Sequence, residues 1–187
     1  MTVDLRVNLG GLEMANPVTD ASGTFAAGRE YADLVDVSRM GAVTTKGVSL
    51  DGWEGNPAPR IAETPSGMLN SIGLQNPGVA HLCAVDLPWI KEQGVPSIVN
   101  VSGHSLEEYV AVLEALEADG QADAYEINIS CPNVDAGGMT FGTHVPSVEA
   151  VVAACRAVAT RPMIVKLSPN VTDIAEIARA AEASGAD

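Results

Sequence analysis

Apolar and polar residues along this chain follow a strand-like pattern and a helix-like pattern in turn. Short apolar runs predict four buried strands, at residues 42–46, 97–101, 125–129 and 163–167. Longer stretches with apolar residues at helical spacing predict helices, at residues 79–93, 106–118, 146–159 and 173–184. The first of these helices is expected to break near Pro88, and Ser105 with Glu108 has the spacing of a capping box. Strands and helices that alternate at roughly thirty-residue intervals predict parallel βαβ units, about five in all.

The N-terminal part of the chain carries a different pattern. Residues 5–9 and 12–15 flank a pair of glycines and predict a β-hairpin. Residues 18–22 predict a short strand, and residues 30–40 predict a helix. Residues 47–77 are rich in Gly, Pro and Asn, and predict a long loop.

Two folds are built from parallel βαβ units, a doubly wound sheet and a (β/α)8 barrel. The doubly wound fold favours a Gly-x-Gly-x-x-Gly turn after its first strand, and residues 21–24 do not match that turn. Polar and reactive residues stand instead at the ends of successive predicted strands, namely Ser22, Lys46, Asn100, Asn128 with Cys131, and Lys166. Because this distribution is typical of the C-terminal face of a barrel, the sequence predicts an α/β fold of the (β/α)8 TIM-barrel type.

The length of the chain limits how much of a barrel it can form. The sequence has 187 residues, and a (β/α)8 barrel typically needs about 250. The last predicted helix is followed only by residues 185–187, where a loop should lead to a sixth strand. We therefore expect residues 1–187 to form one partial barrel domain of a longer protein, truncated after about five βα units.

Composition and charge narrow the class of partner. The formal net charge of −14 argues against nucleic acid or an anionic membrane surface as a partner. No apolar run reaches the roughly 18 residues of a membrane helix, and residues 1–10 contain no signal-peptide core. The three cysteines and three histidines show neither a disulfide framework nor metal-ligand spacing. We expect a cytoplasmic protein without a metal site.

Cys131 is the first candidate for chemistry. It lies in the hexapeptide Asn-Ile-Ser-Cys-Pro-Asn, residues 128–133, where a predicted strand runs out into a loop. A thiol has an ordinary pKa of about 8.5 and can act as a base or a nucleophile once deprotonated. Cys155 lies on the apolar stripe of its helix and Cys83 lies beside Leu82, so both are expected to be small core residues. The alternative for Cys131 is an ordinary loop cysteine without a catalytic role.

Two lysines and two loops complete the candidate site. Only three lysines occur in the chain, and Lys46 and Lys166 fall at the ends of predicted strands, where they could hold an anionic ligand or a reduced cofactor ring. Residues 70–78 combine amides, a hydroxyl and glycines in a pattern that suits a planar anionic ligand. Glycines in residues 137–142 indicate a mobile flap. The alternatives are lysines at a solvent-exposed rim, an ordinary turn and a flexible surface loop.

Taken together, these stretches resemble the class 1 dihydroorotate dehydrogenases, which are flavoenzymes of pyrimidine (UMP) synthesis. The matching segments follow one another along the whole chain, at residues 21–23, 44–47, 70–78, 128–133 and 165–167. The resemblance implies a (β/α)8 barrel with FMN over the carboxyl ends of the strands. It also implies the oxidation of dihydroorotate to orotate.

The resemblance also implies roles for individual residues. Cys131 would be the catalytic base, which takes a proton from C5 of dihydroorotate while C6 delivers a hydride to the flavin. The quinone-linked class has serine at this place. Residues expected to bind the substrate are Lys46, Asn70, Asn128 and Asn133, together with the backbone of Ile72, Gly73 and Leu74. Residues expected to line FMN are Ala21, Ser22, Lys46, Gly47, Asn100, Asn128 and Lys166.

Within class 1, Ile72 and the flap at residues 137–142 resemble the NAD-linked type, although Asp135 stands where that type would be expected to have a basic residue. That type implies a homodimer joined by an electron-transfer subunit, which carries FAD and an iron–sulfur cluster and reduces NAD. The alternatives are a fumarate-linked homodimer, a dihydropyrimidine dehydrogenase and an inactive half-barrel fragment. In the family, strands six to eight supply the loops that hold the FMN phosphate, so a chain without them is expected to bind FMN poorly.

Overall fold

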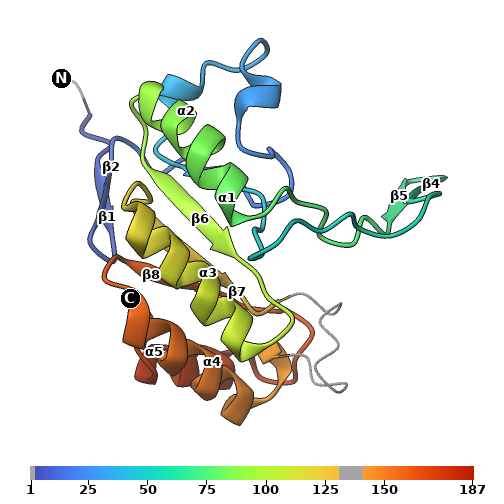
Figure 1. Cartoon of the computed structure of the whole chain (residues 1–187), viewed down its shortest axis with the longest axis vertical. Coiled ribbons are helices and arrows are strands. Elements are labelled where there is room, and N and C mark those ends of the chain that lie inside the picture. Colours follow the sequence, from blue (N-terminus) through green and yellow to red (C-terminus); the bar gives the residue numbers. More distant parts are fainter. Residues whose placement is uncertain (1–2, 131–140) are drawn as a thin grey trace.

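A four-stranded parallel sheet forms the centre of the computed structural model, which describes residues 3–130 and 141–187 (Figure 1). Its strands are β3 (Val43–Thr44), β6 (Ser97–Val101), β7 (Ala124–Asn128) and β8 (Met163–Lys166). They lie side by side in chain order, with Asn100 opposite Glu126 and Asn128 opposite Lys166. A sheet ordered in this way is wound in one direction, whereas a doubly wound sheet reverses its strand order. The α/β prediction is therefore confirmed.

Helices cover one side of the sheet in the same order as the strands (Figure 1). They are α1 (Val79–His81), a π-helical segment η3 (Leu82–Asp86), α2 (Leu87–Glu92), α3 (Leu106–Asp119), α4 (Val145–Val158) and α5 (Ile174–Ala183). Helix α3 contacts α1 and α4, and α4 contacts α5. Right-handed crossovers between neighbouring parallel strands place successive helices on the same face, as observed.

The main hydrophobic core lies between these helices and the sheet. Val99 and Val101 of β6 and Tyr125 and Ile127 of β7 are fully buried in it, beside apolar residues of the helices. Side chains alternate along a strand, so the residues between them face the other side of the sheet. That second face is apolar only at the amino ends of the strands, where Ile98 contributes to a smaller cluster.

The N-terminal hairpin closes this smaller cluster. Strands β1 (Val7–Leu9) and β2 (Leu12–Met14) pair in antiparallel fashion, which confirms the predicted hairpin. Leu12 and Met14 pack with Ala42, Ile98 and Ala124 at the amino ends of the sheet strands. On the same face, the carboxyl ends of the strands carry polar residues instead of apolar ones.

The strand expected at residues 18–22 is reduced to a single parallel bridge between Thr19 and Ala42. Pro17 has no N–H to donate, and the Asp20 side chain takes the main-chain N–H of Thr44 at 2.7 Å. A side chain therefore replaces a main-chain partner that would have extended this strand along β3.

The helix expected at residues 30–40 is wrong. The segment forms two short 3-10 turns, η1 (Arg29–Tyr31) and η2 (Val37–Arg39). Helices in proteins depend mostly on packing of an apolar face, and Leu34 is 81% exposed. Tyr31 and Val35 are exposed as well, and only Val37 is buried, so a helix over the whole segment would have no continuous apolar face to pack.

The long loop expected at residues 47–77 contains a hairpin that the pattern did not predict. Its strands are β4 (Ile61–Thr64) and β5 (Gly67–Asn70), and every one of their residues is exposed. The hairpin projects away from the sheet (Figure 1). Because neither face is buried, the apolar residues follow no alternation that could have revealed it.

The described residues form an open sheet with β3 and β8 at its edges, and no closed barrel. Phe141–Thr143 forms a further 3-10 turn, η4, before α4. Within the described ranges, no helix is both long enough and apolar enough to cross a lipid bilayer.

Candidate functional site

Polar side chains gather on the face of the sheet opposite the helices, toward the carboxyl ends of the strands. Tyr125 and Ile127 point into the helix-covered core, so Glu126 and Asn128 of the same strand point the other way. Asn100 occupies the corresponding face of β6, and Lys166 that of β8. The strand register alone therefore brings residues from three βα units together.

A chain of hydrogen bonds joins the asparagines of this face. Asn100 donates from Nδ2 to the Glu126 carboxylate, and Asn128 donates from Nδ2 to Asn100 Oδ1 at 3.2 Å. Asn128 Oδ1 accepts from the main-chain N–H of Ser130 at 3.3 Å and from its hydroxyl at 2.8 Å. Asn100 is fully buried and Asn128 is 6% exposed, so water has little access to compete for these hydrogen bonds.

Lys166 and Ser22 meet across the sheet although they are far apart in the chain. Lys166 Nζ donates to Ser22 Oγ at 2.8 Å. Both side chains are half-buried. This contact brings the end of the reduced first strand against the end of β8, and places a positive charge at the carboxyl ends of the strands.

Gly47 sits where a larger residue would collide with the asparagine chain. A methyl group added to Gly47 would lie 2.7 Å from Asn100 Oδ1 and 2.8 Å from Ser102 Oγ. Both distances are too short for an unstrained contact. Glycine therefore lets the chain after β3 pass closely beside Asn100.

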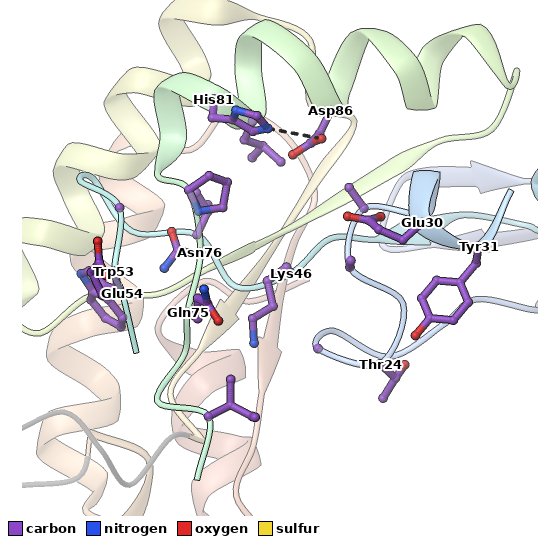
Figure 2. A pocket seen from close by; sticks show the side chains of 18 residues that line it. Thr24, Glu30, Tyr31, Lys46, Trp53, Glu54, Gln75, Asn76, His81 and Asp86 are labelled. Atoms are coloured by element: carbon purple, nitrogen blue, oxygen red, sulfur yellow. Dashed lines mark ion pairs between the residues drawn. The ribbon is translucent and has the colours of Figure 1, made fainter. Parts of the chain in front are cut away.

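Lys46 projects into a cavity of about 780 Å³ beside this face (Figure 2). Ile72 lines the same cavity, as do Thr24 and Trp53. A methyl group added to Gly23 would lie 3.6 Å from Lys46 Nζ, so the loop after residue 22 passes close to the ammonium group. The cavity thus combines one predicted site lysine with four residues of the predicted loop at 70–78, among them Ile72.

Three acidic residues also line the cavity, from η1, η3 and the loop after β3 (Figure 2). They are Glu30, Glu54 and Asp86. Burial raises the pKa of Asp86, against the opposing effect of His81, whose Nε2 lies 3.9 Å from Asp86 Oδ1. The cavity therefore carries acidic side chains as well as the Lys46 ammonium group.

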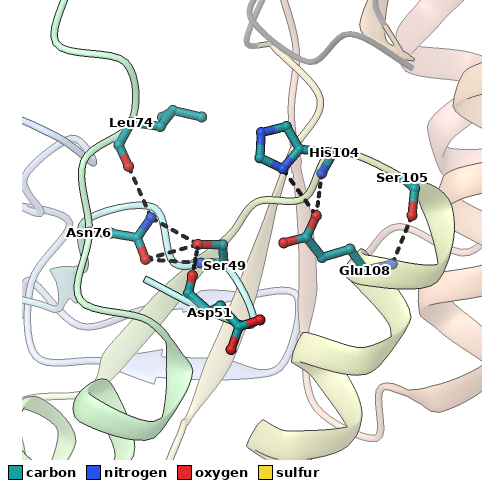
Figure 3. A network of polar contacts seen from close by, with 7 residues as sticks. All are labelled: Ser49, Asp51, Leu74, Asn76, His104, Ser105 and Glu108. Carbon is teal, nitrogen blue, oxygen red and sulfur yellow. Dashed lines mark hydrogen bonds and ion pairs between the residues drawn. The ribbon is translucent and has the colours of Figure 1, made fainter. Parts of the chain in front are cut away.

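The loop that carries Ile72, Gly73 and Leu74 is fixed by an internal polar network (Figure 3). Asn76 donates to the Leu74 carbonyl at 2.9 Å and shares hydrogen bonds with Ser49 at 3.0 and 3.1 Å. Gly73 and Leu74 both have positive φ, at 76° and 52°. This left-handed turn suits Gly73 and is strained at Leu74, so the surrounding contacts hold the loop in place.

Asn70 lies apart from the other predicted site residues. It ends the exposed strand β5 of the projecting hairpin, whereas Asn100 and Asn128 are buried at the sheet. Ala21 is exposed beside Ser22. Cys131, Asn133 and residues 137–140 of the flap lie outside the described residues. Ser130, just before Cys131 in the sequence, donates two hydrogen bonds to Asn128.

The two cysteines expected in the core differ in environment from a reactive thiol. Cys155 is fully buried, and burial raises its pKa to about 12. Cys83 is half-buried, and burial together with nearby Asp119 raises its pKa to about 11. Neither thiol would ionise readily at neutral pH. Among residues 3–130 and 141–187, no group of His, Cys, Asp and Glu could hold a metal ion.

Sequence reasoning missed three residues that contact or support this face, of which Tyr109 does so from α3 on the helix side of the sheet. Glu126 contacts Asn100, Asp20 accepts the Thr44 N–H, and the Tyr109 hydroxyl donates to the Asn128 carbonyl at 2.7 Å. A signal for Glu126 was present, because it is a charged residue inside an apolar strand and stands two positions before Asn128. The contacts of Asp20 and Tyr109 depend on tertiary packing and have no local signal.

The fold and the site together define an α/β protein with a buried polar face at the carboxyl ends of parallel strands. The family model for dihydroorotate dehydrogenase matches residues 4–187. The chain belongs to the dihydroorotate dehydrogenase family.

Curated relatives carry a more specific name, "Dihydroorotate dehydrogenase B (NAD(+)), catalytic subunit". The protein from Alkaliphilus metalliredigens is 53% identical over 185 residues, which is 99% of this chain and 61% of that protein. The one from Bacteroides fragilis is 54% identical over 184 residues, 98% of this chain and 61% of that protein. The one from Pelobacter propionicus is 51% identical over 187 residues, 100% of this chain and 62% of that protein. The chain thus spans about three-fifths of the length of these relatives.

Proposed function

We propose that the complete gene product is the catalytic subunit of an NAD-linked dihydroorotate dehydrogenase, which oxidises dihydroorotate to orotate in pyrimidine synthesis. The observation that carries this proposal is the identity of 51–54% to subunits of that name over almost the whole chain. The position of the polar face supports it, because ligands of α/β barrels bind at the carboxyl ends of the strands. The proposed whole fold is a closed (β/α)8 barrel, of which this chain forms the N-terminal part.

The residues of the polar face fit FMN as the cofactor. A flavin ring presents carbonyl and ring-nitrogen acceptors and gains negative charge on reduction, and this face offers ammonium, hydroxyl and amide donors. They would come from Ser22, Lys46, Asn100, Asn128 and Lys166, with Ala21 and Gly47 beside them. FMN supplies the hydride-accepting chemistry when it is bound. Lys166, which donates to Ser22 at 2.8 Å, would stabilise the negative charge that the reduced ring gains.

The substrate would lie between the asparagines and the loop after β5. Asn128 has a second Nδ2–H beyond its bond to Asn100, which suits a pyrimidine carbonyl. Main-chain groups of Ile72, Gly73 and Leu74 would receive the substrate carboxylate, with Lys46 in the adjoining cavity. Asn70 and Asn133 would complete the contacts to the ring. In the structure Asn70 stands on an exposed strand, so its contact requires the projecting hairpin to move toward the site.

Cys131 is the proposed general base. Its thiolate would remove the proton from C5 of dihydroorotate, and the electron pair of that C–H bond would form the C5–C6 double bond as a hydride leaves C6. Electrons would then reach NAD through a partner subunit that carries FAD and an iron–sulfur cluster. The proposed assembly is a homodimer of catalytic subunits with these electron-transfer subunits, located in the cytoplasm.

The visible absorption spectrum of the complete gene product tests this function. A protein that retains FMN should be yellow, and it should bleach when dihydroorotate is added without oxygen. Dihydrouracil, which lacks the carboxylate, should leave the colour unchanged. Bleaching by dihydrouracil, or none by dihydroorotate, would reject the proposed substrate.

Replacing the proposed base gives a second test. Cys131→Ala should slow flavin reduction by dihydroorotate about 10² to 10⁴-fold, which is the usual contribution of a general base. Cys83→Ala, at a half-buried cysteine away from the polar face, is the matched control and should reduce its flavin at the wild-type rate. Stopped-flow absorbance measures both variants. Normal reduction in Cys131→Ala would remove that residue from the base role.

A further inference from the structure

Glu126 is a charged residue in the middle of β7, whose other four residues are buried. Its neighbours Tyr125 and Ile127 are fully buried on the helix side, whereas its own half-buried side chain lies on the polar face. A carboxylate at such a position is costly unless its oxygens accept hydrogen bonds. Asn100, which is fully buried on the neighbouring strand, provides one through its Nδ2.

This contact fixes the donor-to-acceptor direction of the hydrogen bonds that link Asn128, Asn100 and Glu126. An ionised carboxylate only accepts hydrogen bonds, so the group of Asn100 that faces Glu126 must be the NH₂. Asn100 Oδ1 then points the other way, where it accepts from Asn128 Nδ2 at 3.2 Å and from Ser102 Oγ at 3.4 Å. Each amide in the chain therefore takes the orientation that the previous one requires.

The other end of the chain has the opposite character. The main-chain N–H of Ser130 can only donate, and it donates to Asn128 Oδ1 at 3.3 Å. The chain thus runs from a donor-only group at Ser130 to an acceptor-only group at Glu126. With these two ends fixed, Asn100 and Asn128 each keep one Nδ2–H that no other residue in this chain of bonds uses.

We propose that Glu126 is a positioning residue of this site. It fixes the amides of Asn100 and Asn128 so that both present N–H donors, and it thereby selects a ligand with carbonyl acceptors at the strand ends. The orientation of the amides follows from the hydrogen bonds alone. The identity of the ligand as a pyrimidine over FMN rests on the proposed function.

A double-mutant cycle on the complete gene product tests the proposal. Asn100→Asp places a second acceptor-only group against Glu126, so it should break the chain. Glu126→Gln combined with Asn100→Asp should restore the chain, because the glutamine amide can donate to the new carboxylate. Glu149→Gln, at an exposed glutamate of α4, removes the same charge and is the matched control. The two readouts are the dissociation constant of orotate, from the flavin absorbance change, and the midpoint of urea unfolding.

The expected result is that Glu126→Gln recovers about tenfold of the orotate affinity that Asn100→Asp loses, with a parallel recovery of the unfolding midpoint. Glu149→Gln should recover neither. Additive losses in both readouts would overturn the proposal, and so would recovery of stability without recovery of affinity. If the wild-type protein binds no orotate, the proposed function fails. The unfolding cycle then still decides the orientation of the amides, and additive losses there would overturn it.

Discussion

Asp20 has one carboxylate oxygen well placed and the other without a partner among the described residues. Its Oδ1 accepts the Thr44 N–H at 2.7 Å, whereas Oδ2 is buried and accepts no hydrogen bond. Burial raises the pKa of Asp20, and the nearby negative charge of Glu126 raises it further, against the hydrogen bond from Thr44. The folded protein therefore favours the protonated form of this side chain.

The sign of the pH dependence at Asp20 follows from this direction. Because the pKa is higher in the folded state, the stability linked to Asp20 is fully present below its ordinary pKa of 3.8. That stability is lost as the pH rises through the raised value. Above both values the charged side chain is a cost to the folded state.

We expect Asp20→Asn to stabilise the complete gene product at pH 7. The asparagine oxygen keeps the Thr44 contact, and its NH₂ replaces the unpartnered oxygen beside Glu126. The gain should be about 1 kcal/mol, at the low end for an unsatisfied buried acceptor because part of the side chain reaches solvent. Urea unfolding at pH 4 and pH 7 should show a smaller gain at pH 4. Asp33→Asn, at an exposed position, should show little change at either pH.

At this scale the sequence predicted the site by residue type and position at strand ends. Ser22 with Lys166, and Asn100 with Asn128, are joined as that distribution implied. The contacts of Asp20 and Glu126 were missed because a carboxylate within a strand pattern is usually assigned to the solvent-facing side of the strand. Only the tertiary structure shows that solvent is largely replaced by amides on that face.

Helix α5 shows how a single side chain starts an element of this fold. Asp173 is its N-cap, and Oδ1 accepts the main-chain N–H groups of Ala175 at 2.9 Å and Glu176 at 3.2 Å. These N–H groups have no partner inside the helix. Arg179 lies 4.0 Å from the same carboxylate, but both side chains are exposed, so that ion pair contributes little.

We expect Asp173→Ala to lower the free energy of unfolding by about 1 kcal/mol, the usual value of a helix N-cap. Asp173→Asn keeps an acceptor for the two N–H groups but removes the charge that faces Arg179. It should therefore retain most of the stability. Urea unfolding of the complete gene product compares the two variants, and equal losses would assign the effect to charge rather than to capping.

Elements with a buried apolar face were predicted well, and those without one were not. Strand β6 has the predicted bounds, and α3 begins after Ser105, whose side chain accepts the Glu108 N–H at 3.3 Å. The capping box is modified, because the Glu108 carboxylate accepts from the His104 N–H at 2.7 Å instead. Strands β4 and β5 are wholly exposed, and residues 31–35 are exposed too, so hydrophobic spacing carries no information about either segment.

The predicted break near Pro88 takes the form of a π-helical segment. Proline cannot donate to the carbonyl four residues earlier, and its ring collides with that carbonyl. Segment η3 ends at Asp86 and α2 begins at Leu87, so Pro88 falls in the first turn of a new helix. The chain thus keeps a helical path through residues 79–92 and tolerates the proline.

At the scale of the molecule, the sheet order agrees with the choice that the sequence made between a barrel and a doubly wound sheet. Strands in chain order with helices on one face belong to the singly wound arrangement from which barrels are built. Closure could not be read from these residues, because it depends on strands that pair with the edges β3 and β8. The carboxyl-end position of the polar site follows from the sheet alone.

The last prediction concerns the 187-residue chain produced on its own. Among the described residues, no strand pairs with the outer side of β8, and β3 has only a single bridge and the Asp20 contact at its outer side. Strands exposed in this way are templates for association with other chains. The family resemblance places the FMN phosphate loops in strands six to eight, and phosphate contacts of this kind are charge-assisted and strong. We therefore expect this chain to self-associate and to bind FMN at least about a hundredfold more weakly than the complete gene product.

Light scattering after size exclusion and quenching of FMN fluorescence measure these two properties. The complete gene product, handled in parallel, is the control for both. A monomeric 187-residue chain that binds FMN as tightly as the control would contradict the prediction. It would mean that the polar face is sufficient to hold the flavin without the phosphate loops. That face consists of the lysines and asparagines at the carboxyl ends of the four sheet strands, together with Ser22.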